Sequence, residues 1–195
     1  MLTFCVAIFL LIITPGPGVL STAGVGSAFG FNAGYRYLIG LFLGTNLVAI
    51  AVISGLAGVM LSIPGLRQVL LILSTAYLFY LAARIALSGS RIAFIAAQRA
   101  PGMLNGVTLQ IINPKAYVVN TTLFSGFPFE QYGFLTETII KLVIINLFWI
   151  PIHLLWLGAG VSLKKLALSD RKQRVINMIM AGSMIAVVLL ALSGL

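Results

Sequence analysis

The sequence predicts an all-α integral membrane protein with six transmembrane helices, arranged as two inverted three-helix repeats. Composition is the first reason: 61% of the 195 residues are hydrophobic, only 8% are charged, and the mean hydropathy is +1.13. Soluble domains carry about 25% charged residues, and disordered chains combine low hydrophobicity with high charge. The second reason is that the apolar residues form uncharged runs long enough to cross a bilayer. The third is a proline motif that occurs once in each half.

Charged residues divide the chain into six apolar segments. A spanning helix needs about 20 mostly apolar residues, and the segments that satisfy this are 3–25, 38–62, 67–88, 104–126, 139–163 and 175–195. The first lacks the basic flank of a signal peptide, so we interpret it as a span. We expect one membrane domain, 1–195, with repeat 1 at about 1–90, a cytoplasmic connector at about 89–103 and repeat 2 at about 104–195. Cys5, the single cysteine, excludes an internal disulfide.

Lysines and arginines predict the orientation. Nine of the twelve lie in or beside the loops after the first, third and fifth spans: Arg36, Arg84, Arg91, Arg99, Lys164, Lys165, Arg171, Lys172 and Arg174. The opposite side holds Arg67 and Lys141, and Lys115 lies within a span. The positive-inside rule then makes those loops cytoplasmic and puts both termini outside. The net charge of +9 is therefore a topology signal rather than a sign of nucleic-acid binding, since no RNA-binding motif accompanies it.

The two halves of the chain share a short motif. At an offset of 99 residues, segment 10–15 (LLIITP) lies over segment 109–114 (LQIINP). The same offset places the second span over the fifth and the third over most of the sixth. Because three helices per half is an odd number, the second half enters the membrane from the opposite side. Inverted repeats of this kind are common in secondary transporters, whose sites lie at the repeat interface on broken helices.

Proline interrupts the first and fourth spans near mid-bilayer. Thr14-Pro15 and Asn113-Pro114 each have the pattern of an N-cap followed by proline at the first helical position. The first span is loosened further by three residues: Gly16, Pro17 and Gly18. We expect broken helices, in which each break begins a half-helix whose N–H groups and positive dipole end face the membrane centre. The alternative is a pair of ordinary proline kinks.

Lys115 follows the second of these prolines and is a charge in the middle of a span. A mid-span lysine costs about 2.5–3.5 kcal/mol on insertion scales and should face the protein interior or water. No acid lies in any predicted span, because Glu130, Glu137 and Asp170 fall in or near loops. We therefore expect a substrate carboxylate as the partner of Lys115, with backbone carbonyls, water or snorkelling as alternatives.

The fifth span carries a polar face. Five residues at helical spacing share it: Asn146, Trp149, His153, Trp156 and Gly160. His153, the only histidine, is of the type that titrates near physiological pH. We expect it either to be a hydrogen-bonded packing residue or to carry protons or contact substrate. Asn46 in the second span has the same two interpretations, whereas Gly40 and Gly44 predict close helix packing.

The sequence lacks the motifs of several other classes of protein. There is no phosphate-binding Gly-x-x-x-x-Gly-Lys loop, so the chain has no nucleotide-driven motor of its own. No Gly-x-Ser-Gly motif supports an intramembrane serine protease. A metal-ion exporter is less favoured, because it would be expected to have intramembrane acids or further histidines.

The two proline motifs resemble those of a known family. Thr14-Pro15-Gly16-Pro17-Gly18 and Asn113-Pro114-Lys115 are similar to motifs of the LysE/RhtB family of amino-acid exporters, the LysE-type translocators. Segments 34–44, 77–81 and 174–177 resemble parts of its second, third and last helices, so the resemblance covers nearly the whole chain. It implies a bacterial inner-membrane carrier that exports amino acids or related metabolites, driven by the proton gradient.

The chain departs from the family pattern at two places. Gly18 stands where many members have asparagine, although glycine also occurs there. Gly44-Thr45-Asn46 stands where many members have an acidic residue. Because nothing fixed in the membrane would pair with a cationic side chain, we expect a neutral amino acid rather than a basic one.

We therefore predict a secondary transporter, not an enzyme, with the proton as its coupling ion. The expected substrate-binding and translocation residues are Thr14, Pro15, Gly16, Pro17, Gly18, Asn46, Asn113, Pro114, Lys115, Trp149 and His153. The expected partners are a small amino-acid substrate and the lipid bilayer, with no cofactor, metal or nucleic acid. A passive channel and a non-transporting structural membrane subunit are the alternatives.

Overall fold

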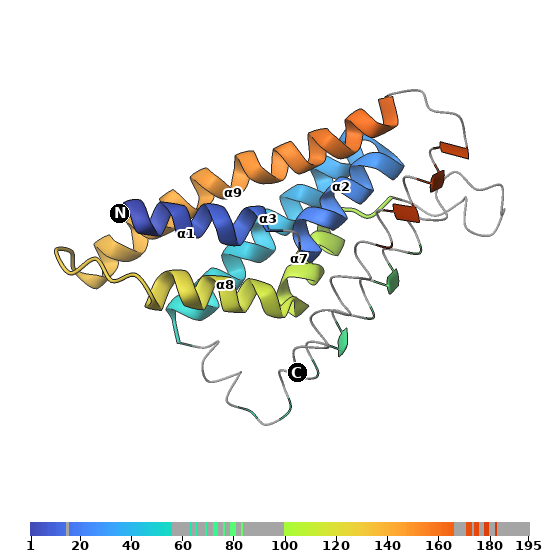
Figure 1. Ribbon diagram of the computed structural model, residues 1–195. Coiled ribbons are helices and arrows are strands. Elements are labelled where there is room, and N and C mark those ends of the chain that lie inside the picture. Colours follow the sequence, from blue (N-terminus) through green and yellow to red (C-terminus); the bar gives the residue numbers. More distant parts are fainter. Residues whose placement is uncertain are drawn as a thin grey trace.

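The computed structural model describes residues 1–14, 16–55 and 100–165, with isolated positions between 63 and 83 and between 171 and 182. Most of the expected spans 67–88 and 175–195 and most of the connector 89–103 therefore lie outside the described residues, as does Pro15. All regular structure in the described ranges is helical, and its six helices pack side by side (Figure 1). The predicted all-α class is thus confirmed for this part of the chain.

The first expected span contains two helices. α1 (Leu2–Ile13) and α2 (Pro17–Phe29) are bent by 50° relative to each other. The N-cap of α2 is Gly16, followed by Pro17, so the prediction that Thr14-Pro15 begins this half-helix is wrong by two residues. The helical region is disfavoured for a residue before proline, and Gly16 is extended, with φ −162° and ψ 178°. Thr14 instead ends α1, and its hydroxyl donates back to the Leu10 carbonyl.

The second span begins earlier than the charge pattern predicts. α3 (Phe31–Ile53) starts directly after Gly30, whose φ of 89° allows the chain to reverse between α2 and α3. Arg36 lies on the exposed side inside α3, not in a loop. The expected boundaries 38–62 were wrong because a charged residue does not end a helix, whereas a glycine with positive φ does. Gly55, with φ 75°, similarly follows the end of α3.

The fourth expected span also contains two helices. α7 (Met103–Ile112) and α8 (Pro114–Ser125) meet at Asn113. The Asn113 side chain accepts a hydrogen bond of 3.1 Å from the Lys115 backbone N–H, and Pro114 occupies the first helical position. This is the capping arrangement that asparagine followed by proline favours. Lys115 is therefore held in the first turn of α8.

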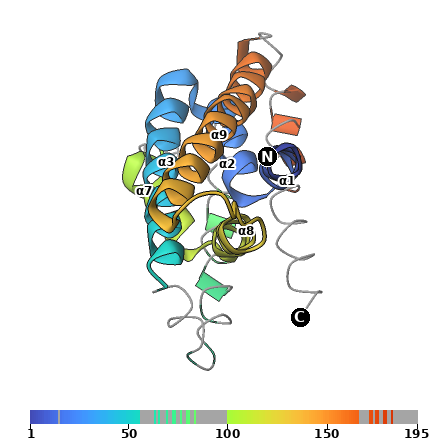
Figure 2. The same cartoon turned by 90° about the vertical axis from the view of Figure 1, so that its left-hand side faces the viewer.

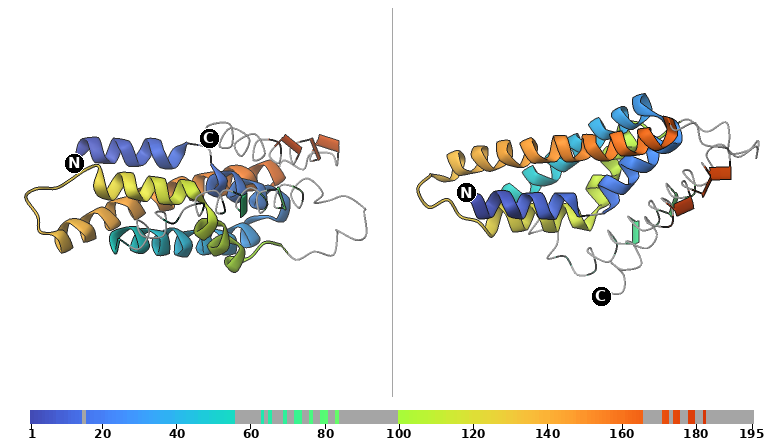
Figure 3. Two further views of the ribbon diagram at one scale, coloured as in Figure 1. Left: turned by 90° about the horizontal axis from the view of Figure 1, so that it is seen from below. Right: turned by 45° about the horizontal axis from the view of Figure 1, so that its top comes forward.

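α9 (Phe134–Lys165) is the longest described helix and continues through Pro151. It packs on α2 and α3, and its first half lies beside α1, which also contacts α8 (Figure 3, right). Viewed end-on, α1 and α3 flank α9 on opposite sides (Figure 2). In the described part of the chain, Phe31–Ile53 and Phe134–Leu163 are long and apolar enough to cross a membrane, and α1 with α2 makes a third if the pair is one span.

Glycines bring the helix backbones together. A Cβ added at Gly160 would meet the Ala23 carbonyl oxygen of α2, and one at Gly40 would meet the Met103 carbonyl oxygen of α7. At Gly44 it would lie 2.7 Å from the Gln110 Cβ atom. The close packing predicted for Gly40 and Gly44 is thus confirmed, and small residues act here as they do at other membrane helix interfaces. These contacts hold α9 close to α2 and α3 close to α7.

Candidate functional site

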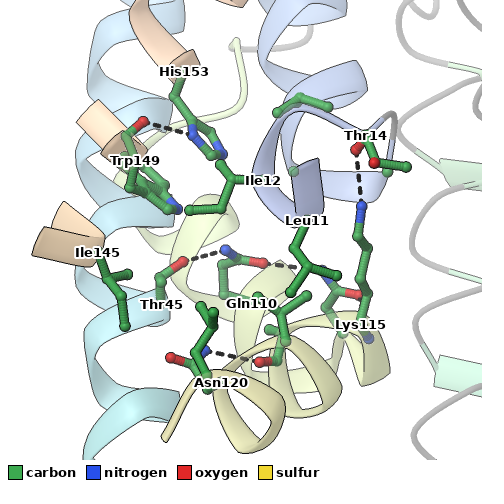
Figure 4. Close-up of a pocket in the computed structure, with 17 residues that line it drawn as sticks. Leu11, Ile12, Thr14, Thr45, Gln110, Lys115, Asn120, Ile145, Trp149 and His153 are labelled. Atoms are coloured by element: carbon green, nitrogen blue, oxygen red, sulfur yellow. Dashed lines mark hydrogen bonds between the residues drawn. The ribbon is translucent and has the colours of Figure 1, made fainter. Parts of the chain in front are cut away.

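A pocket lies where the junction of α1 and α2 faces the junction of α7 and α8, with α3 and α9 behind it (Figure 4). Its cavity volume is about 70 Å³, counted as the space that the centre of a water molecule can occupy. One part of its lining is polar: Thr14, Thr45, Gln110, Asn113, Lys115, Asn120 and His153. The other is largely aliphatic: Leu11, Ile12, Val19, Ala116, Val119, Leu123 and Ile145. A concave, mostly apolar site with a few convergent polar groups is the usual form of a small-molecule pocket.

The structure brings most of the predicted site residues into this pocket. Those that line it are Thr14, Gly16, Gly18, Asn113, Lys115, Trp149 and His153. Pro17 and Pro114 are absent from the lining and act by starting α2 and α8. Pro15 lies outside the described residues, and Asn46 faces another helix.

Lys115 reaches across the pocket from α8 to α1. Its Nζ atom donates a hydrogen bond of 2.8 Å to the Thr14 carbonyl oxygen, at the C-terminal end of α1. A backbone carbonyl was one of the partners the sequence left open. An ammonium group has three donors, so this bond leaves two for a ligand. The half-buried side chain lies against Gly16, where an added Cβ would be 2.9 Å from Nζ.

A chain of hydrogen bonds supports the floor of the pocket. The Asn113 amide donates to the Gln110 side-chain oxygen over 3.0 Å, and the Gln110 amide donates to the Thr45 hydroxyl. Asn120 donates to the Ala116 carbonyl over 2.8 Å. Sequence reasoning missed Thr45, Gln110 and Asn120. The signal for Gln110 was present, because it precedes Asn113 by three residues and so shares its helix face.

The two helix starts at the pocket differ in their capping. Asn113 caps α8 with its side chain. At Gly16 no side chain caps α2, and a glycine has none to offer. The first N–H groups of a helix are donors at the positive end of its dipole. Of the two half-helix starts that the sequence predicted as anion sites, the uncapped one at α2 is therefore the better donor.

His153 and Trp149 form the wall contributed by α9. The His153 Nδ1 atom lies 2.9 Å from the Trp149 carbonyl oxygen, and the two rings stack with centroids 3.6 Å apart and planes 13° from parallel. Each side chain is 4% exposed. The imidazole is therefore held in one orientation at the edge of the pocket.

Asn46 and Asn146 pair with each other instead of lining the pocket. Each side-chain amide donates to the side-chain oxygen of the other, over 3.2 Å and 3.0 Å. Each also donates to the backbone carbonyl four residues earlier, Phe42 for Asn46 and Leu142 for Asn146. The pair therefore joins α3 to α9 and leaves little amide capacity for a ligand.

Lys141 is a second buried lysine with a different environment. It was expected at a loop on the outer side, but it is 1% exposed near the start of α9. Its Nζ atom lies 2.6 Å from a Glu137 carboxylate oxygen, donates 2.8 Å to the Phe124 carbonyl and lies 5.1 Å from the centre of the Phe129 ring. Because its charge is fully partnered, Lys141 joins α8 to α9 and presents no charge to a ligand.

Among the described residues, apolar helices, two of them long enough to cross a membrane, surround a pocket that contains a cation and several amides. Over residues 9–194 the sequence matches the LysE type translocator family, and the chain belongs to this family. The resemblance seen in the proline motifs is therefore confirmed.

The chain is also similar to an individual protein of known name. Over 131 residues the chain is 28% identical to the leucine efflux protein of Klebsiella pneumoniae subsp. pneumoniae. The match includes 65% of this chain and spans only 62% of the length of that relative. No solved structure matches the chain.

Proposed function

We propose that the protein is a secondary transporter that exports a neutral amino acid across the bacterial inner membrane, driven by the proton gradient. The observation that carries the proposal is Lys115, whose ammonium lies in a pocket with no Asp or Glu in its described lining. A substrate carboxylate supplies the missing negative charge. Membership of a translocator family and similarity to a protein named for leucine efflux support the same assignment.

The substrate carboxylate binds between Lys115 and the start of α2. Lys115 contributes charge-assisted hydrogen bonds, and the uncapped N-terminal turn of α2 contributes backbone donors and the positive end of its dipole. The aliphatic part of the lining receives the side chain, with Leu123 and Ile145 among its buried members. A cationic side chain would find no carboxylate there, which favours a neutral substrate.

We further propose that the two halves are an inverted repeat with broken helices. In this arrangement α1 with α2 and α7 with α8 are each one interrupted span, and α3 corresponds to α9. The Asn46–Asn146 pair supports this assignment, because the two residues, which are 100 positions apart where the proline motifs are 99 apart, make the same set of hydrogen bonds. In a two-fold arrangement, a residue on the axis pairs with its own equivalent.

The proposal is tested by reconstituting the protein in proteoliposomes and measuring flux of a panel of labelled amino acids, with and without a pH gradient. We expect flux of leucine and similar neutral amino acids, exchange against unlabelled substrate, and accumulation when a pH gradient is imposed. Flux that follows the concentration gradient without exchange would identify a passive channel. Absence of flux for every amino acid would identify a structural subunit.

A further inference from the structure

We propose that the Nε2 atom of His153 is the acceptor that binds the ammonium group of the substrate. The inference rests on the proposed function and deepens it, because it assigns the second charged end of a zwitterionic amino acid. The pocket contains Lys115 for the carboxylate but no acid for the ammonium. A neutral acceptor must therefore take that role.

The hydrogen bond of His153 determines which of its nitrogens is the acceptor. The Trp149 carbonyl oxygen can only accept, so the Nδ1 atom 2.9 Å away carries the proton and donates. A second proton on the ring would place a buried cation in the same pocket as Lys115 without a carboxylate, which is strongly unfavourable. The ring is neutral, and its Nε2 atom has a lone pair and no hydrogen.

That lone pair has no partner among the described residues, although the side chain is 4% exposed and lines the pocket. A buried acceptor without a hydrogen bond is costly, which points to a ligand that supplies the donor. Stacking on Trp149 keeps the ring from turning toward another partner. The site is therefore built before the ligand arrives.

The acceptor lies at the same turn of α2 as the cation. An added Cβ at Gly16 would be 2.9 Å from Lys115 Nζ, and one at Gly18 would be 3.6 Å from His153 Nε2. Gly16 and Gly18 are two residues apart, so both groups border the first turn of α2. An α-amino acid carries its carboxylate and ammonium on one carbon atom and can contact both groups at once. The absence of side chains at Gly16 and Gly18 leaves this access open.

The test compares three ligands that differ only in their charged groups. L-Leucine has both groups, leucinamide keeps the ammonium without the carboxylate, and 4-methylpentanoate keeps the carboxylate without the ammonium. Their dissociation constants are measured by direct titration of the full chain in lipid nanodiscs. His153→Phe keeps an aromatic ring beside Trp149 and removes both nitrogens. It should weaken leucine and leucinamide about ten- to a hundredfold and leave 4-methylpentanoate unchanged.

A second variant blocks access to the Nε2 atom of His153 without changing the imidazole ring. Gly18→Ala introduces a methyl group at ordinary contact distance from Nε2, and no neighbouring atom must move. It should reproduce the ligand pattern of His153→Phe, and it keeps the test decisive if the phenylalanine variant fails to fold. Leu155→Phe, at a 69% exposed position of the same helix, is the matched control and should leave all three affinities unchanged.

Two results would overturn the inference while leaving the proposed function intact. One is an equal loss for leucine and 4-methylpentanoate, which would make His153 a packing residue. The other is unchanged affinity for all three ligands with loss of pH-gradient-driven uptake, which would assign His153 to proton transfer. Failure of the wild-type protein to bind any of the three ligands would overturn the proposed function itself.

Discussion

Lys115 and Lys141 show how one residue type serves two purposes within 26 positions of the same chain. Lys141 has a carboxylate, a carbonyl and an aromatic ring around its ammonium, and it is 1% exposed. Lys115 has one carbonyl and an open pocket. A partnered buried charge holds structure together, whereas an incompletely partnered one is available for binding.

This contrast predicts that replacing lysine with methionine weakens ligand binding at position 115 and lowers stability at position 141. Lys115→Met should weaken leucine binding about ten- to a hundredfold, because it removes a charge-assisted hydrogen bond to the carboxylate. Leucinamide, which lacks the carboxylate, should lose much less affinity. The variant should stay folded, since the loss of one bond to Thr14 is offset by removing a charge from the membrane. Binding by titration and thermal unfolding measure the two effects.

Lys141→Met is the control for this comparison. It should lower the unfolding temperature, because Glu137 loses its partner and the Phe124 carbonyl loses a donor. Leucine affinity of the folded fraction should remain at the wild-type value. Equal losses of leucine and leucinamide affinity in Lys115→Met would make Lys115 a structural residue and exclude the carboxylate site.

Neighbouring helices depend on glycine where their backbones meet. Two glycines of α9, Gly160 and Gly158, allow this to be tested. A Cβ at Gly160 would meet the Ala23 carbonyl oxygen of α2, whereas one at Gly158 would meet nothing within 4 Å. Gly160→Ala should therefore destabilise the protein by about 1–3 kcal/mol, the usual cost of overpacking. Gly158→Ala should be neutral or stabilising by about 0.5–1 kcal/mol, since alanine is the better helix former. Unfolding in mixed micelles measures both, and equal effects would contradict the close contact of α2 and α9.

The Asn46–Asn146 pair connects α3 to α9 and yields a second prediction for these helices. Single alanine substitutions and the double substitution form a cycle that isolates the interaction between the side chains. Polar contacts between membrane helices contribute about 0.6 kcal/mol on average and up to about 1.7, so we expect a coupling energy in this range. Leucine affinity should change little, because neither asparagine lines the pocket. A large loss of leucine affinity without a coupling energy between the two asparagines would indicate that Asn46 belongs to the binding site.

The orientation of the whole molecule follows from its charge distribution and can be measured with single cysteines. Cys5→Ser removes the only native thiol. In that background, Tyr132→Cys in the loop after α8 should react with a membrane-impermeant maleimide in intact cells, because this loop is predicted to lie outside. Gly102→Cys, before α7, should react only after the membrane is permeabilised. The reverse pattern would contradict the predicted orientation, and labelling of both positions from one side would contradict the crossing of the membrane between them.

Local chemistry made part of this structure predictable. Composition alone determines that the chain needs a bilayer, and proline with a preceding asparagine determines that α8 begins at Pro114. The start of α2 at Pro17 was missed, although the same rule applies: Gly16 precedes a proline, which disfavours the helical region for that residue. The position of Lys115 one residue after a helix start was likewise readable, because it depends only on neighbours in sequence.

Tertiary packing decided which polar residues meet. Thr45 lines the pocket while its neighbour Asn46 pairs with Asn146, because consecutive helical residues point about 100° apart. Whether Thr45 or Asn46 faces the pocket depends on how α3 packs against α7 and α9. The burial of Lys141 and of His153 also depends on residues from distant segments. The sequence by itself determined the class, the family and the start of α8, because these depend on composition and local backbone geometry. Only the tertiary structure decided the membership of the pocket, because helix faces acquire their neighbours when the helices pack.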